Sequence, residues 1–181
     1  MDTSAKRSGL PQALVLAVGS VAIASADLEG AVRRVVADLC NADPVNGTWL
    51  VFEGQSMDWL IQNGKVLVSD EFDSARRHGH GDLPNLFRQA ERLKAERNLV
   101  IHGQWYPECS YPHPEDAALM CTPHSADTYA QAGPVCHVEG SRYRKWSLEQ
   151  AWAVSEIEEL ADRLDQLANR FCSIYNLPDI P

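Results

Sequence analysis

Residues 96–103, near the middle of the chain, read Glu-Arg-Asn-Leu-Val-Ile-His-Gly. They end a segment whose apolar residues recur in steps of three and four, namely Leu86, Ala90, Leu93 and Val100. This spacing predicts a helix with one buried face. Arg97 takes the position on that face between Leu93 and Val100. Gly103 is a usual helix stop, so we expect His102 in the last turn.

Three polar side chains of this segment are expected to rim one pocket where the helix meets a neighbour. At about 100° per residue, Asn98 and His102 share one edge of the helix and Arg97 lies on the adjoining edge. Arg97 and His102 by themselves point about 140° apart, so their convergence on one atom requires a frayed helix end or a second chain. A guanidinium on a buried face also needs a partner, because burying an unpaired charge is costly.

Length and composition indicate one well-buried domain over residues 1–181. The hydrophobic share of 45% and the charged share of 23% are ordinary for a globular protein of this length. The formal net charge of −9 argues against a surface devoted to duplex nucleic acid, but it allows a small basic site. The five cysteines follow no disulfide spacing and indicate reduced thiols in a cytoplasmic protein.

The N-terminus imitates a secretory signal. Lys6 and Arg7 precede an apolar run over residues 13–24, and Ala24-Ser25-Ala26 resembles a cleavage site. The apolar pattern nevertheless continues in phase beyond that site, through Leu14, Val18, Val21, Ser25, Leu28, Val32, Val35 and Leu39. One long core helix explains this continuity, so we expect a cytoplasmic protein that retains it. No uninterrupted apolar run reaches the roughly 20 residues of a membrane span, and we expect no membrane partner.

Two helices are predicted before the central one. The first covers residues 11–40. The second covers residues 49–63 and ends at Asn63-Gly64, although residues 49–52 also suit a short strand. The central helix is expected to begin at Asp82, two residues before a proline.

Residues 104–146 have a different character, with several prolines and no helical period. Loops and short strands are expected there, at residues 105–106, at 118–121, and at 135–138 or 143–146. Ser147 and Gln150 form a capping box. Behind it a long amphipathic helix is predicted, with an apolar face of Ile157, Leu160, Leu164, Leu167, Phe171 and Ile174.

The run Arg97-Asn98-x-x-x-His102 at the end of a bundle helix resembles the Arg-x4-His motif of HEPN domains (higher eukaryotes and prokaryotes nucleotide-binding). Many bacterial members carry Asn directly after the Arg. The whole run, with Gly103 and Trp105 after His102, resembles the corresponding run of uncharacterised HEPN-like proteins. The long first helix, the motif helix and the capped last helix fit the family's layout, so the resemblance spans most of the chain. It implies a mainly α fold, an antiparallel helical bundle with an irregular, short-strand insertion before the last helix.

For active members, the resemblance implies a metal-independent endoribonuclease that needs no cofactor, with the Arg and His of two chains facing each other in a homodimer. Such cleavage needs a base for the ribose 2′-hydroxyl, an acid for the leaving oxygen and cationic donors for the phosphorane. Histidine ordinarily titrates near neutrality, so His102 suits either proton transfer. Arg97 would bind the phosphate through two hydrogen bonds, and Asn98 would orient His102 or bind a phosphate oxygen. A toxin or defence role with a cognate antitoxin also follows from the resemblance.

The motif has two other interpretations. One is a non-catalytic HEPN-like module that binds nucleotide, RNA or a protein partner through the same groove. The other is structural: Arg97 bonds backbone carbonyls or a carboxylate such as Glu156 or Glu158, and His102 caps the helix end. The enzyme requires accessible Arg97 and His102, close to the same residues of a second chain, whereas the module permits both to be buried.

Two weaker groups of residues lie between the last two helices. Arg142, Arg144 and Lys145 are interleaved with aromatic residues, a mixture that suits binding of single-stranded RNA but also an ordinary polar strand. Cysteines and histidines are also present, and two of them have the two-residue gap of a zinc knuckle, but the set matches no recognised zinc spacing, so we expect no metal. This set is Cys109, His113, Cys121, His124, Cys136 and His137.

Overall fold

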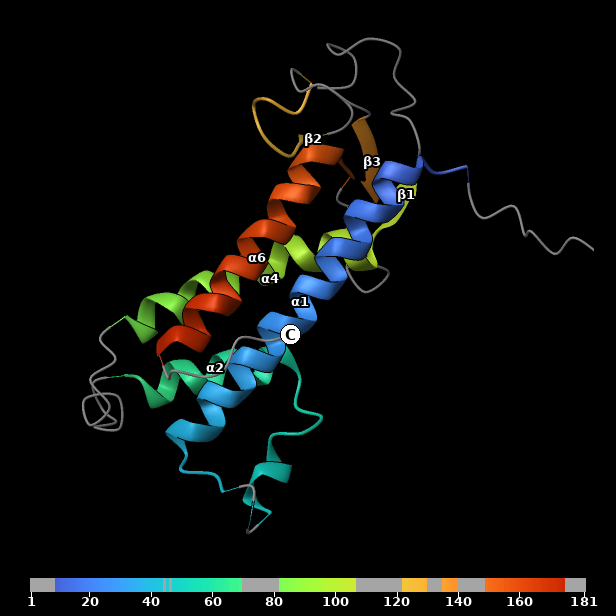
Figure 1. Cartoon of the computed structure of the whole chain (residues 1–181). Helices are drawn as coiled ribbons and strands as arrows, with labels where there is room; N and C mark the ends of the chain where they lie inside the picture. Colours follow the sequence, from blue (N-terminus) through green and yellow to red (C-terminus); the bar gives the residue numbers. More distant parts are fainter. Residues whose placement is uncertain are drawn as a thin grey trace, which may run out of the picture. The chain divides into compact units, whose positions relative to one another are not determined.

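The computed structural model describes residues 9–43, 45, 47–69, 82–106, 122–129, 135–139 and 149–174. Over these residues the chain is mainly helical, with a small sheet whose strands precede the last helix (Figure 1). This confirms the predicted mainly helical class with short strands before the last helix. Contacts divide the chain into two compact units, Met1–Ala22 with Glu96–Ala161 and Ile23–Ala95 with Asp162–Pro181. One domain over residues 1–181 stays a prediction.

The first helix, α1, covers Gln12–Leu39 and confirms the predicted helix at residues 11–40. Its repeating apolar face is buried on both sides of the signal-like site: Leu14 and Val21 precede that site, and Leu28 and Val32 follow it. Ser25, inside that site, is itself only 6% exposed. By length and composition α1 is also apolar enough to cross a membrane, a property that core helices and signal sequences share. Cytoplasmic localisation therefore stays a prediction.

The predicted second helix is partly wrong. Residues 48–51 form a short 3-10 turn, η1 (Thr48–Val51), and the α-helix begins later, as α2 (Met57–Leu67). Ser56 caps it, because its hydroxyl accepts a hydrogen bond from the Trp59 N–H (3.2 Å). The predicted stop at Gly64 is also wrong, since α2 continues to Leu67.

Gly64 is present for packing rather than for termination. A Cβ built at this position would lie 2.2 Å from Cε1 of Phe87, so only glycine lets the Phe87 ring of α4 (Leu83–His102) approach α2 this closely. The Phe87 ring in turn packs edge-on against Phe171, with centroids 5.3 Å apart. The unit built from Ile23–Ala95 and Asp162–Pro181 is therefore held by interlocking apolar side chains.

The last helix, α6, covers Val154–Ile174. Most of its predicted face is confirmed, because Ile157, Leu160, Leu164, Leu167 and Phe171 are all fully buried. Ile174, the last residue of that face, is only half-buried. The predicted capping box is wrong: Gln150 lies in strand β4 (Glu149–Ala153), and Ser147 is outside the described residues. Pairing with two distant strands overrides the local capping signal.

In the part of the chain that the structure describes, four strands form one sheet in the order β1-β3-β4-β2. Strand β3 (Val135–Glu139) pairs antiparallel with both β1 (Gln104–Tyr106) and β4, and β2 (Thr122–Pro123) pairs parallel with β4. The predicted strands at 105–106 and 135–138 are confirmed, whereas residues 118–121 and 143–146 lie outside the described residues. The central position of β4 explains why its Ala151 and Trp152 are fully buried.

A buried carboxylate joins this sheet to α6. Glu156, 3% exposed, accepts a hydrogen bond from the Ala153 N–H (2.7 Å) and so caps the first turn of the helix. Its other oxygen accepts from the hydroxyls of Ser125 (2.5 Å) and Thr128 (3.1 Å), on the loop after β2. One side chain thus fixes a helix start, a strand end and a loop.

Candidate functional site

The candidate site is the C-terminal turn of α4, within the unit that contains Glu96–Ala161. The helix ends at His102 as predicted, and the Gly103 N–H closes its last turn on the Leu99 carbonyl (2.9 Å). The Trp105 indole N–H donates to the Val100 carbonyl (2.8 Å), which satisfies one of the carbonyls that a helix end leaves unpaired. Because α4 ends at His102, and β1 begins at Gln104 and pairs with β3, regular secondary structure holds the backbone before and after Gly103.

His102 is exposed at this end of the helix, whereas Val100 is fully buried. Among the described residues no hydrogen bond to the imidazole occurs. An accessible imidazole fixed on a capped helix end suits proton transfer to or from a bound molecule. Accessibility of His102 is one of the two conditions that the enzymatic interpretation sets.

Arg97 is half-buried on the helix face between the buried Leu93 and Val100. Its Nη1 donates a hydrogen bond to the Oδ1 of Asn98, at 2.9 Å. The amide of the next residue thus orients the guanidinium. Sequence reasoning assigned Asn98 to His102 or to a phosphate, and did not anticipate this bond between neighbouring side chains.

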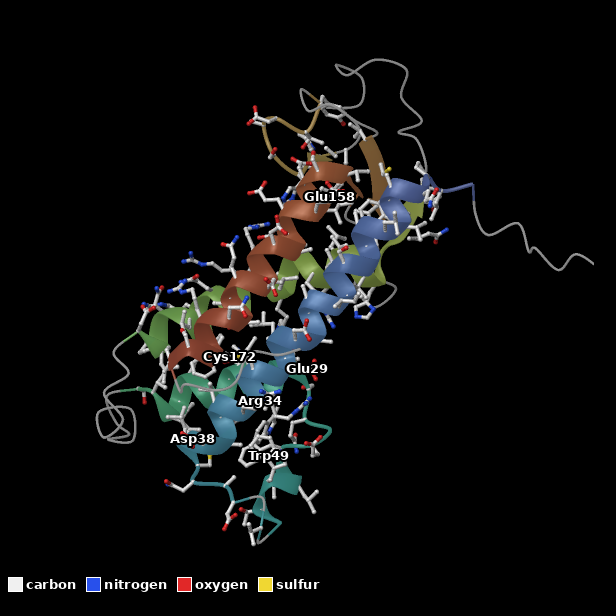
Figure 2. All side chains as sticks on the ribbon, viewed as in Figure 1. Glu29, Arg34, Asp38, Trp49, Glu158 and Cys172 are labelled. Atoms are coloured by element: carbon white, nitrogen blue, oxygen red, sulfur yellow. The ribbon has the colours of Figure 1, made fainter. Side chains whose placement is uncertain are left out.

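The two carboxylates considered as partners of Arg97 are Glu156 and Glu158. Glu156 uses both oxygens on Ser125, Thr128 and the start of α6, as described above. Glu158 is exposed on α6 (Figure 2). By side-chain type, Arg97 is a cationic hydrogen-bond donor and His102 an acid or base.

The remaining predicted site residues are described only in part. Arg142, Arg144 and Lys145 lie outside the described residues, as do three of the six residues considered for zinc (Cys109, His113 and Cys121). Of the others, Cys136 is buried, and burial raises the pKa of its thiol to about 11. The His124 ring stacks on Trp152, with centroids 3.4 Å apart. Within the described ranges, no three His, Cys, Asp or Glu residues are grouped as metal ligands would be.

Sequence reasoning missed two residues that shape this region. Trp105 was noted as part of the motif, but its bond to the helix end was not foreseen. Glu156 was considered for Arg97, although a Glu three residues after the last strand residue is itself a capping signal.

Comparison of the chain with protein-family models, with curated proteins and with solved structures found no match in any of the three.

Proposed function

We propose that this chain is a metal-independent endoribonuclease of the HEPN type, whose site combines Arg97, Asn98 and His102 of two copies. The observation that carries the proposal is the exposed His102 imidazole on a capped helix end, five residues after an arginine that Asn98 orients (2.9 Å). The resemblance of the Arg-Asn-x3-His run to the family motif supplies the reaction class.

In the proposed reaction the ribose 2′-oxygen attacks the adjacent phosphorus, and the bond from phosphorus to the 5′-oxygen breaks. The products are a 2′,3′-cyclic phosphate and a free 5′-hydroxyl. One His102 takes the proton of the 2′-hydroxyl, and the His102 of the second copy gives a proton to the leaving 5′-oxygen. Arg97 stabilises the extra negative charge on the phosphorane through charge-assisted hydrogen bonds.

A homodimer is part of this proposal for a geometric reason. On one helix the Arg97 and His102 directions differ by about 140°, so one copy presents the two groups poorly to a single phosphate. A two-fold axis beside the end of α4 would bring two imidazoles and two guanidinium groups around the same bond. It would also provide one histidine for each proton transfer.

The test is cleavage of a mixed-sequence RNA in excess EDTA. The wild-type chain is compared with His102→Ala and Arg97→Ala at matched folded fraction, and with Arg92→Ala as the control. Arg92 is an exposed arginine on the same helix, so its removal changes the charge but not the site. We expect wild type and Arg92→Ala to cut equally, and each site variant to lose about 100-fold or more.

The competing interpretation is a binding module that uses the same helix end without chemistry. It is favoured if wild type is inert in this assay while labelled RNA or nucleotide still binds, and if Arg97→Ala weakens that binding. Equal cleavage by wild type and His102→Ala contradicts the proposal, because it assigns the activity to another site or to a contaminant.

A further inference from the structure

The connection between α1 and α2 exposes apolar side chains to solvent. Val45, Leu50 and Val51 are 92%, 70% and 60% exposed, and Trp59, at the start of α2, is 36% exposed. We call these four residues the apolar tip. Their exposure contrasts with Phe52, which is 6% exposed and packs edge-on against Trp59.

Internal bonds hold the connection in shape. The Asp43 N–H donates to the Thr48 hydroxyl (2.7 Å), and Asp43 Oδ1 accepts from the Val45 N–H (2.7 Å). Gly47 adopts a positive φ of 78° just before η1, where a side chain would be strained. The Trp49 indole donates to Glu53 (2.9 Å). A folded turn therefore presents Leu50 and Val51 to solvent, and such pre-organised apolar groups favour a binding surface.

Along the chain, the apolar tip lies in an acidic range. Residues 35–64 contain four carboxylates and no lysine, arginine or histidine; Arg34 precedes this range on α1, and Lys65, which follows it on α2, pairs with Glu91. Asp58 pairs with Lys94, and in the part of the chain that the structure describes no cation pairs with the other three, namely Asp38, Asp43 and Glu53. Asp38 lies near the end of α1 and Trp49 in η1 (Figure 2).

We infer that the apolar tip binds a basic amphipathic segment of a partner protein. Such a segment covers Leu50 and Val51 with apolar side chains and pairs its lysines or arginines with the exposed carboxylates. A second copy of this chain fits less well, because a two-fold contact would oppose identical acidic surfaces. An anionic membrane and a nucleic acid repel the same carboxylates. This inference is independent of the ribonuclease proposal.

The probe is a fluorescent peptide of about 18 residues, long enough for a helix, made of leucine and lysine in amphipathic register. Binding to the whole chain is followed by fluorescence anisotropy. We expect the double variant Leu50→Ser/Val51→Ser to weaken binding by about tenfold or more, and Asp38→Asn/Glu53→Gln to weaken it by a similar factor at low salt. The carboxylate effect disappears at about 1 M salt, where screening acts over about 3 Å.

Two matched variants separate this surface from general attraction to an acidic protein. Ile23→Ser removes an aliphatic side chain that is 69% exposed on α1, and Glu158→Gln/Glu159→Gln removes two exposed charges on α6. Both should bind the peptide as wild type does. Equal loss in these controls overturns the inference, as does equal binding of a leucine–glutamate peptide. Dimers that dissociate in Leu50→Ser/Val51→Ser, or tip-dependent binding to anionic vesicles, overturn it in favour of self-association or a membrane.

Discussion

The two compact units of this chain are stabilised in different ways. In the unit of Ile23–Ala95 and Asp162–Pro181, helices interlock through apolar contacts such as Gly64 with Phe87 and Phe87 with Phe171. In the unit that contains Glu96–Ala161, a small sheet is joined to α6 by one buried carboxylate, Glu156. Both units bury apolar side chains, Trp152 and Ile157 among them in the second unit, and the second unit adds the buried carboxylate with its hydrogen bonds. A change of side-chain volume therefore tests the contacts named for the first unit, and a loss of hydrogen bonds tests those of Glu156.

The largest effect on stability is expected from Glu156→Ala. It leaves the Ala153 N–H and the Ser125 hydroxyl without their acceptor, whereas the Thr128 hydroxyl keeps the Ser125 carbonyl (3.0 Å) as its acceptor. Each unsatisfied buried group costs about 1–3 kcal/mol, so we expect a loss of about 4 kcal/mol in the free energy of unfolding, measured by urea denaturation. The exposed Glu158→Ala, on the same helix, should change it by less than about 0.5 kcal/mol. Equal effects of both variants would contradict the role given to Glu156.

A smaller loss is expected from Gly64→Ala. The new Cβ would lie 2.2 Å from the Phe87 ring, and overpacking of this kind costs about 1–3 kcal/mol. Gly30→Ala, in the interior of α1 with nothing within 4 Å of its Cβ, should instead stabilise by up to about 1 kcal/mol. Urea denaturation of both variants gives the comparison. The two substitutions should change the free energy of unfolding with opposite signs, and the addition of Phe87→Leu should recover part of the Gly64→Ala loss.

A loss of about 1 kcal/mol is expected from Trp105→Phe, which keeps the ring but removes the hydrogen bond to the Val100 carbonyl. Faster amide hydrogen exchange should accompany it in the last turn of α4, next to His102. Trp59→Phe is a suitable control, because the Trp59 indole N–H has no recorded acceptor among the described residues and lies on another helix. Unchanged exchange in Trp105→Phe would show that the indole does not hold the helix end.

A further effect, which appears only at alkaline pH, is expected from Cys136. Burial raises the pKa of this thiol from 9.0 to about 11, so the folded state keeps the proton at pH values where the unfolded state has lost it. The contribution to stability is therefore complete below about pH 9 and is lost as the pH rises toward about 11. Urea denaturation across this range should show a steeper decline for wild type than for Cys136→Ala. Parallel declines would contradict the assignment.

The helical elements could be predicted from the sequence because their information is local. The period of Leu14 through Leu39, and that of Ile157 through Phe171, defines buried faces without reference to other segments. Gly64 was mistaken for a helix stop, because its reason lies in Phe87, far along the chain. The start of α6 was misplaced because the pairing of β4 with β2 and β3 is not local.

In the candidate site, too, the features set by the local sequence could be predicted and those set by surrounding packing could not. The position of His102 in the last turn of α4 could be predicted from the period and from Gly103. The bond from Arg97 to Asn98 could not, because the orientation of two neighbouring polar side chains depends on the packing around them. Arg142, Arg144 and Lys145 stay predictions as RNA-binding residues.

The most direct test of the proposed site compares an RNA with its fully 2′-O-methylated counterpart, both in excess EDTA, with wild type and His102→Ala. Wild type should cut the RNA, leave 2′,3′-cyclic phosphate ends and spare the methylated strand, because the attacking 2′-hydroxyl is blocked. His102→Ala should cut neither. Cleavage of the methylated strand, or RNA cleavage retained in His102→Ala, would contradict the account, and an inert wild type would leave the helix end as a binding surface without chemistry.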